Sequence, residues 1–440
     1  MKIKKANINN ILSVFLLSHL FIWTLVPSIT NLNLPLDTIE ALAWSSNLDW
    51  GFNKHPPLSA FAVEIFYQIF GSQDWAYYFL SQIFVLTSFF IVWKFSNEIF
   101  KNKIYSLISV LLLESIYFFN FTTPEFNVNV CQLPFWALTV YYSWKIYSKK
   151  NIEIKDCIFL GIFAGIGFLS KYLFLYLLIS IKLLFLYIIF VKKYKKYSHK
   201  YLLPTLFFII ILTPHIFWLI NNEYITITYG LHRSGLSDPN IFDHIKYPLI
   251  FFVKQITILI PFFILSFLLV SKFKFNLKFS DQKLLFLLTI NIIPFFLIFL
   301  TSLIIGAKIR TMWMTPFYLF IGTLLVYVFQ NKINFKKIKN FYLVLIFLFL
   351  ISPIIYSYIS ITQLDKRTDY PGKEIAKKVQ KKWDSEFNEP INVVLGNEWV
   401  AGNLSYHLKS RPSWEGEIDK NKLNNYNVFI CIDNICVGNK

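Results

Sequence analysis

Residues 284–305 read LLFLLTINIIPFFLIFLTSLII, and this stretch contains no charged side chain. An α-helix needs about 20 apolar residues to cross the hydrocarbon core of a bilayer, so the stretch predicts a transmembrane helix. The rest of the chain has the same character, since 55% of its 440 residues are hydrophobic and only 15% are charged. The sequence therefore predicts an α-helical polytopic membrane protein.

About eleven such segments follow one another through residues 1–360. They fall near 11–29, 75–96, 104–120, 128–147, 157–170, 172–191, 201–220, 247–270, 284–305, 315–330 and 341–360. No small-residue cleavage site follows the first segment, which favours a retained helix over a signal peptide. Residues 1–360 are expected to form one transmembrane domain.

Basic residues between the segments set the expected orientation. The patches KIKK, SKK, KKYKK and KKIK fall on one face of the predicted bundle. Because Lys and Arg concentrate in cytoplasmic loops, we expect the N-terminus to lie in the cytoplasm. An odd number of spans then places the C-terminal tail outside, in the periplasm of a bacterial inner membrane.

The distribution of charge argues against a nucleic-acid partner. The formal net charge is +18, but the excess lies between the hydrophobic segments and not in residues 362–440. The four cysteines have no metal-type spacing, and the sequence contains no glycine-rich phosphate loop. The sequence therefore indicates no cofactor and no metal ion, and membrane lipids are the expected surroundings.

Two segments outside the membrane carry their own secondary-structure signals. In the first loop (residues 30–74), TIEALAWSSNLDW and PLSAFAVEIFYQIF have apolar residues at helical spacing, which suits short helices in the interface plane. In the tail (residues 361–440), PGKEIAKKVQKKW and GNLSYHL indicate helices, and INVVL and NVFICI indicate strands. The tail is therefore expected to be a small soluble α/β domain.

The end of the tail, NVFICIDNICVG, contains two cysteines. A two-residue turn at Asp433-Asn434 would set Cys431 opposite Cys436 on adjacent strands, within reach of a disulfide. An oxidising compartment outside the membrane permits that bond. Two free thiols are the alternative, because Asp-Asn is a weaker turn signal than Asn-Gly.

Ionisable residues gather in the outside loops, although these loops are far apart in the sequence. They are Asp37, Glu40, Lys54, His55, Glu125, Lys171, Arg233, Lys308 and Arg310. Several cations beside a carboxylate suit an anionic ligand and a group that can accept a proton. A lipid-linked phosphate fits this pattern, because its head group lies at the depth of these loops.

Each of these residues also has a plainer interpretation. Asp37 could be a solvated interface residue, and Glu40, one turn later, is expected on the helix surface. Lys171 lies between two apolar runs and could extend its ammonium to the interface. Arg310 could act as an anchor in an aromatic belt, and His55 could cap the helix that follows it.

The first loop also contains a spaced pattern. After Asp37 the chain reads Trp50-Gly51-Phe52 and then His55-Pro56-Pro57-Leu58. This pattern resembles the first periplasmic loop of the dolichyl-phosphate-mannose-protein mannosyltransferase-like family, which includes the lipid A aminoarabinose transferases. Later segments resemble family motifs in the same order: TTPE at 122–125, GIGFLSKY at 165–172 and W-x-x-P at 313–316.

The resemblance implies a GT-C fold and a membrane glycosyltransferase. Such an enzyme moves a single sugar from a polyprenyl-phosphate donor, here undecaprenyl phosphate, to lipid A, another glycolipid or a protein on the periplasmic face. The carboxylates expected to be catalytic are Asp37 and Glu125. The residues expected to bind the donor phosphate are Lys54, His55, Lys171, Arg233 and Arg310. Those expected to shape the site are Trp50, Gly51, Phe52, Pro56, Pro57 and Trp313.

The sequence departs from the family pattern at three places. The family's Asp-Glu pair is Asp37-Thr38 here, and its T-P-D acid is Glu125. The aminoarabinose transferases have Lys where His55 stands, with Lys54 adjacent in this chain. In the corner itself, Gly51 is expected to allow a sharp turn, and the two prolines to stiffen the start of the next helix.

A transporter or flippase of a lipid-linked or anionic substrate is the alternative. It predicts broken helices with charges at mid-membrane and an internal repeat. The sequence shows no repeat, but Lys182 and Lys254 lie within predicted spans. These lysines would favour a transporter unless each pairs with a carboxylate such as Glu114. A structural subunit with an inactive site is a further possibility.

Overall fold

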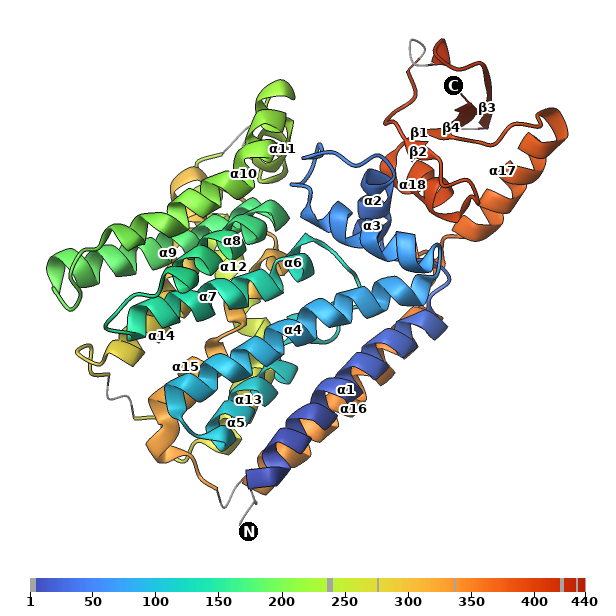
Figure 1. The fold of residues 1–440 in the computed structure, drawn as a ribbon. Helices are drawn as coiled ribbons and strands as arrows, with labels where there is room; N and C mark the ends of the chain where they lie inside the picture. The colour runs from blue at the N-terminus through green and yellow to red at the C-terminus, as the bar shows by residue number, and fades with distance from the viewer. Residues whose placement is uncertain are drawn as a thin grey trace.

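The computed structural model describes residues 5–235, 240–274, 277–335, 338–419, 423–432 and 434–439. The chain is mostly helical, with a small sheet near its C-terminus (Figure 1). The α-helices before the tail are α1 (Lys5–Thr30), α2 (Leu36–Ser45), α3 (Leu58–Phe70), α4 (Asp74–Phe100), α5 (Lys103–Leu111), α6 (Val128–Cys131), α7 (Leu133–Ser148), α8 (Ile154–Ser170), α9 (Leu175–Leu186), α10 (Leu203–Asn221), α11 (Ile225–Arg233), α12 (Asp243–Ile258), α13 (Ile260–Leu269), α14 (Gln282–Ile305), α15 (Ile321–Phe329) and α16 (Ile338–Thr362).

Six helices among the described residues are long and apolar enough to cross a membrane. They are Ile8–Thr30, Asp74–Phe100, Tyr172–Val191, His199–Asn221, Gln282–Ile305 and Ile338–Thr362. Two further helix pairs reach this length but are bent, α12 with α13 by 47° and the pair Thr311–Tyr318 and Ile321–Lys332 by 49°. The predicted class, a polytopic helical membrane protein, is confirmed.

The expected count of about eleven spans is not confirmed, because three predicted segments form shorter pieces. Residues 104–120 form α5 and then 3-10 turns at Leu112–Ser115 and Tyr117–Phe119. Residues 128–147 divide into α6 and α7 at Gln132, and α8 has 17 residues. Apolar composition predicted these segments, but polar residues and prolines interrupt two of them.

A buried polar contact lies at one of these breaks. His19 Nδ1 of α1 lies 3.1 Å from the Oε2 atom of Glu114, and both side chains are fully buried. Asn120 donates to the backbone carbonyl of Glu114 at 2.6 Å. The expected pairing of Lys182 or Lys254 with Glu114 is therefore wrong, and both lysines are exposed on the bundle surface.

Two groups of neighbouring helices form opposite sides of the bundle. In Figure 1, α1 and α16 run side by side along one edge, and α4 lies next to α1. On the other side, α8 packs against both α7 and α10. Gly161 and Gly165 of α8 lie where added Cβ atoms would press on Pro204 and Ile211 of α10, so these glycines let the two helices approach closely.

The first loop forms α2 and α3 at one end of the bundle (Figure 1), and both predicted helices are present. The corner between them is closed by a backbone hydrogen bond from Phe52 N–H to the carbonyl of His55, at 3.0 Å. Pro57 is the N-cap residue of α3, with φ −78°. This position suits proline, because the first amide groups of a helix have no intrahelical acceptor.

Over its described residues, the tail contains a four-stranded sheet and the α-helices α17 and α18. They are α17 (Gly372–Glu386), β1 (Val393–Gly396), α18 (Glu398–His407), β2 (Ser413–Trp414), β3 (Val428–Ile432) and β4 (Ile435–Asn439). The strand order is β2-β1-β4-β3, and only the β1–β2 pair is parallel. The predicted helices and the strands β1 and β3 lie where the sequence placed them, whereas β2 was missed.

The antiparallel register of β3 and β4 sets Cys431 opposite Cys436, and the structure joins the two residues in a disulfide. Asp433, half of the expected turn, lies outside the described residues. Cys436 also pairs with Leu395 of β1, so the disulfide-bonded hairpin of β3 and β4 lies directly beside the strand that leads into α18.

The tail packs directly on the first loop, a contact that the sequence did not predict. Gly402 of α18 lies so close to α2 that a Cβ there would be 2.9 Å from the Cβ of Ala43. Arg411 donates to the Leu42 carbonyl at 2.7 Å, and its guanidinium lies 4.0 Å from the centroid of the Tyr67 ring. The tail therefore holds α2 in place from the side opposite the bundle.

Candidate active site

A cavity of about 340 Å³ opens at the end of the bundle where α2 lies. Its lining comes from the first loop, the α8–α9 junction, α11 and the segment that follows α14. We call it the site cavity. The predicted site residues that line it are Asp37, Lys54, His55, Pro56, Lys171, Arg233, Arg310 and Trp313. Residues separated by more than 250 positions in the sequence therefore meet in one place.

Asp37 lies in the first turn of α2, directly after the N-cap residue Pro35 and Leu36. Burial raises the pKa of its carboxyl group, and four cations lower it, namely Lys171, Lys54, Arg233 and Arg310 in order of effect. The side chain thus faces positive charge from four separate segments. A carboxyl group in this setting can ionise near neutral pH and accept a proton from a bound hydroxyl group.

Glu125 does not line the site cavity but lies behind Asp37. Its Oε1 atom accepts a hydrogen bond of 3.1 Å from the backbone N–H of Asp37, so it satisfies one of the free amides at the start of α2. Burial and the charge of Asp37 raise the pKa of Glu125 to about 8. At neutral pH Glu125 therefore carries a proton.

Lys171 occupies the break between α8 and the next helix, where its backbone is extended at φ −165° and ψ 136°. This geometry turns the side chain inward, and only 4% of the residue is exposed. Its Nζ atom donates to Asn129 Oδ1 at 2.6 Å and lies 4.8 Å from the ring centroid of Trp313. Burial lowers the pKa of Lys171 to about 7. An interface anchor would point outward, which this side chain does not do.

Two arginines complete the cationic wall. Arg233 ends α11, and Arg310 directly precedes the 3-10 helix Thr311–Tyr318. The two segments are joined by a backbone hydrogen bond of 2.9 Å from Lys308 N–H to the Ser234 carbonyl. Burial and the charge of Arg233 lower the pKa of Arg310. Two guanidinium groups that line one cavity and repel each other favour an anion there.

Lys54 lines the site cavity but already has two partners. Its Nζ atom lies 2.8 Å from Glu40 Oε1 and also contacts Glu398 Oε2 of the tail. Burial raises the pKa of Glu40 to about 7, and the expectation that Glu40 lies on the helix surface is wrong. Burial lowers the pKa of Lys54, but the two carboxylates raise it more, so Lys54 stays charged.

His55 contributes a neutral ring. Burial and the charges of Lys171, Lys54 and Arg233 lower its pKa to about 3. The imidazole is therefore neutral at neutral pH and can donate one hydrogen bond. It contributes a polar group, and not a positive charge, to the lining of the cavity. Its edge faces the Trp44 ring at a centroid distance of 6.0 Å.

The corner residues Trp50, Gly51 and Phe52 do not line the site cavity. Gly51 and Phe52 line a neighbouring cavity, and Trp50 packs on Phe61. Gly51 lacks the positive φ angle of a sharp turn, so the expected reason for glycine is wrong. Its Cβ would overlap the Trp218 ring, and close packing against α10 is the reason that only glycine fits.

The geometry can now be compared with known proteins. A family model described as dolichyl-phosphate-mannose-protein mannosyltransferase matches residues 54–218. The predicted family is confirmed over this segment. The segment contains His55, Glu125 and Lys171, whereas Asp37, Arg233 and Arg310 lie outside it.

Individual relatives agree with this family. An undecaprenyl phosphate-alpha-4-amino-4-deoxy-L-arabinose arabinosyl transferase of Wigglesworthia glossinidia brevipalpis is 35% identical over 111 residues, which are 23% of this chain. The match covers only 18% of that relative's length.

Solved structures show the fold over nearly the whole chain. The crystal structure of ArnT from Cupriavidus metallidurans bound to undecaprenyl phosphate has a TM-score of 0.61 at 11% identity. The apo structure of the same protein has a TM-score of 0.63 at 10% identity. Each comparison covers 94% of this chain and 87% of the ArnT chain. The chain has the GT-C fold of these structures.

This GT-C chain uses residues that sequence reasoning missed. Glu398 accepts hydrogen bonds from Trp44 Nε1 at 3.1 Å and Asn53 Nδ2 at 2.9 Å, in addition to its contact with Lys54. Asn129 binds Lys171. No local sequence signal marks either residue. Within the described ranges, no group of three or more His, Cys, Asp or Glu side chains is placed to hold a metal ion.

The ion pairs of Lys54 lead to a stability prediction. Lys54→Met is expected to lower the free energy of unfolding by about 2–3 kcal/mol, because two mostly buried carboxylates lose their shared cation. Adding Glu398→Gln to Lys54→Met should recover part of this loss, whereas Glu398→Gln alone should destabilise the protein. The measurement is the melting temperature of the full chain in detergent, with the exposed Lys246→Met as control. Strictly additive losses would show that Lys54 and Glu398 are not coupled.

Proposed function

We propose that this chain is a glycosyltransferase that moves one sugar from a polyprenyl-phosphate carrier to an acceptor hydroxyl or phosphate group at the outer face of a bacterial inner membrane. One observation carries the proposal: a single cavity unites the Asp37 carboxylate with Lys171, Arg233 and Arg310. The confirmed family segment and the GT-C fold support this activity, and the ArnT structure named above holds undecaprenyl phosphate.

In this proposal, the cations bind the donor phosphate and stabilise it as a leaving group. When the bond between the anomeric carbon and the phosphate oxygen breaks, the electron pair stays on the phosphate, which changes from a monoanionic diester to a dianion. Lys171, Arg233 and Arg310 are positioned before the reaction, so they stabilise this added charge without reorganising. His55 lines the same wall as a neutral hydrogen-bond donor.

Asp37 acts on the acceptor. An acceptor oxygen attacks the anomeric carbon from the face opposite the phosphate, which inverts its configuration, and the proton of a hydroxyl acceptor moves to the Asp37 carboxylate. Where the acceptor is itself a phosphate, Asp37 positions the sugar instead. Glu125 fixes the start of α2 and hence the position of Asp37. Lipid A or a related glycolipid is the acceptor class that the arabinosyl transferase relative suggests.

The proposal is tested by transfer in right-side-out membrane vesicles. Purified vesicles receive a radiolabelled polyprenyl-phosphate sugar, and label is expected in the lipid fraction that contains lipid A. Protease added to the same vesicles should cleave the tail, because we propose that the N-terminus is cytoplasmic and the tail periplasmic. Movement of the lipid across the membrane without sugar transfer would favour the flippase alternative.

One feature of the flippase alternative is present, since the bundle contains two bent helix pairs. The charges do not follow them, however. Lys182 and Lys254 are exposed, while the cationic cluster lies in the site cavity at one end of the bundle. A transporter needs its charged site near the midplane, so the charge distribution favours the transferase.

A further inference from the structure

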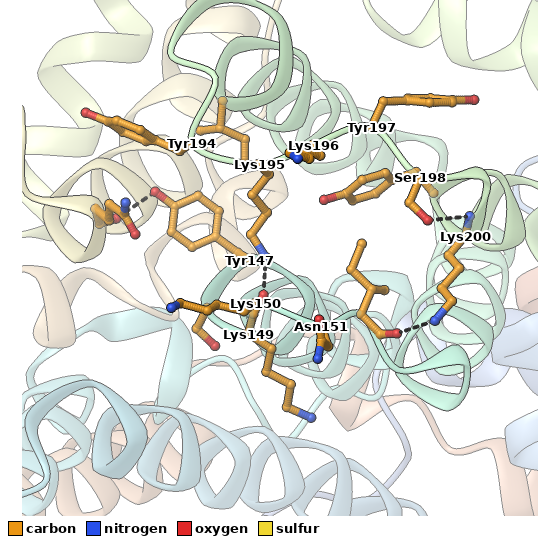
Figure 2. A pocket seen from close by; sticks show the side chains of 15 residues that line it. Tyr147, Lys149, Lys150, Asn151, Tyr194, Lys195, Lys196, Tyr197, Ser198 and Lys200 are labelled. Carbon is orange, nitrogen blue, oxygen red and sulfur yellow. Dashed lines mark hydrogen bonds between the residues drawn. The ribbon is translucent and has the colours of Figure 1, made fainter.

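A second polar cavity, of about 780 Å³, lies at the end of the bundle opposite the tail. Figure 2 shows its lining, which comes from the end of α7, the loop after it, and the segment between α9 and α10. We call it the lysine cavity, after Lys149, Lys150, Lys195, Lys196 and Lys200. Tyr147, Tyr194, Tyr197 and Tyr201 stand between the lysines.

The charge of one of these lysines is compensated by the protein. Lys149 lies 2.6 Å from Glu153 and 2.8 Å from Asp156. Lys195 and Lys200 are instead held by neutral groups. Lys195 donates to the carbonyl of Lys149, and Lys200 to that of Ile152 at 2.9 Å (Figure 2). Lys195 also donates to the carbonyl of Ile146. Carbonyl groups orient an ammonium group but do not neutralise it.

The remaining two lysines add to this positive charge. Among the described residues, Lys150 and Lys196 form no ion pair. An ammonium group has three protons, so Lys195 retains one and Lys200 two for an added ligand. Burial lowers the pKa of Lys195 to about 8, and Lys195 has no ion pair among the described residues. Four lysines around one hollow favour an anion with several oxygen atoms.

An apolar groove of about 660 Å³ adjoins the lysine cavity. It is lined mainly by aliphatic and aromatic side chains of α8, α9 and α10, and it shares Tyr197 and Tyr201 with the lysine cavity. Two of these helices belong to segments long and apolar enough to cross a membrane, so the groove lies at the depth of the lipid chains. The Tyr201 hydroxyl is buried without a hydrogen-bond partner where the two hollows meet.

We propose that the lysine cavity and the groove together bind one acidic phospholipid. Its phosphate lies among Lys150, Lys195, Lys196 and Lys200, and an acyl chain lies in the groove. The Tyr201 hydroxyl then has an acceptor in the lipid's ester or phosphate oxygens. This site lies at the other end of the bundle from the site cavity and does not depend on the proposed transferase activity.

Two features distinguish this site from basic residues that only set topology. Basic residues that only orient a chain in the membrane need to lie near one membrane face, but they need not surround a cavity. These lysines do surround a cavity. A free phosphate would need only the lysines, while the continuous apolar groove provides a place for a chain that a free phosphate lacks. Basic pockets between transmembrane helices are known to bind acidic head groups.

The test compares phosphatidylglycerol with phosphatidylcholine on the delipidated full-length protein, by native mass spectrometry. Phosphatidylglycerol is expected to bind with a stoichiometry of one, and phosphatidylcholine much more weakly. Lys150→Gln with Lys196→Gln should weaken phosphatidylglycerol binding by roughly thirtyfold, since each lysine near an anionic lipid contributes about a factor of five or six. Lys192→Gln with Lys193→Gln removes the same charge from the same segment outside the cavity and should change binding little.

A second variant tests the groove. Thr205 lines it and is exposed, so Thr205→Trp can fill the groove without overpacking the core. This variant should weaken phosphatidylglycerol binding severalfold while leaving the melting temperature unchanged. The proposal would be overturned if the two lipids bound equally, or if both lysine pairs lost binding equally. It would also be overturned if glycerol 3-phosphate, which has no acyl chain, bound as tightly as phosphatidylglycerol.

Discussion

Replacing Asp37 by Asn is expected to reduce sugar transfer by about two to four orders of magnitude, the usual contribution of a general base or of a group that positions the substrate. Expression and membrane insertion should remain normal, because Asn preserves the shape of the side chain. The expectation rests on position, since Asp37 is the carboxylate of the site cavity that faces Lys171, Arg233 and Arg310 together. The measurement is transfer from a radiolabelled polyprenyl-phosphate sugar in membranes.

A control must distinguish the effect of losing the Asp37 charge from the effect of losing another carboxylate in the same loop. Asp49→Asn is the matched control, because Asp49 lies in the same loop, lines a different cavity and binds Trp218 through its carboxylate. Glu40→Gln is a poorer control than the sequence suggested, since Glu40 is a partner of Lys54. Asp49→Asn should retain most of the transfer activity.

Glu125 provides the sharper comparison. Its pKa of about 8 means that Glu125 is protonated at neutral pH, and a glutamine imitates this neutral form. In the variant Glu125→Gln, the side-chain carbonyl of the new amide can still accept the hydrogen bond from the Asp37 backbone N–H. Glu125→Gln should therefore reduce transfer at pH 7 by less than about tenfold. Retained activity in Asp37→Asn together with lost activity in Glu125→Gln would move the catalytic role to Glu125.

Much of the fold could be predicted because it depends on local patterns. In a bilayer, a long uncharged run such as 284–305 can satisfy its backbone hydrogen-bonding groups only as a helix. The apolar residues of β1 and β3 alternate or cluster as they do in strands. The expected span count is not confirmed where polar contacts between distant segments lie at breaks in the predicted helices. Glu114 lies in the 3-10 helix that follows α5, and it contacts His19 of α1, a pairing that the local sequence does not show.

The site shows the same limit. The family pattern identified Asp37, Lys171 and the residues around His55, because these have fixed spacing along the chain. It could not identify Glu398, which reaches Lys54 only after the tail has packed on α2. Nor could it show that Trp50 and Phe52 do not line the site cavity, since a corner motif does not specify the direction of its side chains.

Lys171 is expected to make donor binding depend on pH. Its pKa of about 7 means that it is charged below this pH and loses its proton as the pH rises above it. Above pH 7, the free enzyme must therefore take up a proton to pair this lysine with phosphate, and the apparent affinity should fall by up to about tenfold per pH unit. A phosphodiester donor keeps one negative charge across this range, so the slope of apparent affinity against pH reflects the titration of Lys171.

The variant Lys171→Met should lose this slope. At pH 6 it should bind the sugar donor about ten- to a hundredfold more weakly than the wild type, the contribution of a charge-assisted hydrogen bond of roughly 1.5–3 kcal/mol. Arg233→Ala should weaken binding by a similar factor but keep the slope, because a guanidinium does not titrate in this range. The measurement is the donor KM between pH 6 and 9, with Lys246→Met as a control, because it removes an exposed cation that does not line the cavity. An unchanged KM in the double variant Lys171→Met with Arg233→Ala would exclude both residues from the phosphate site. A slope that persists in Lys171→Met would instead assign the titration to another group that faces the phosphate.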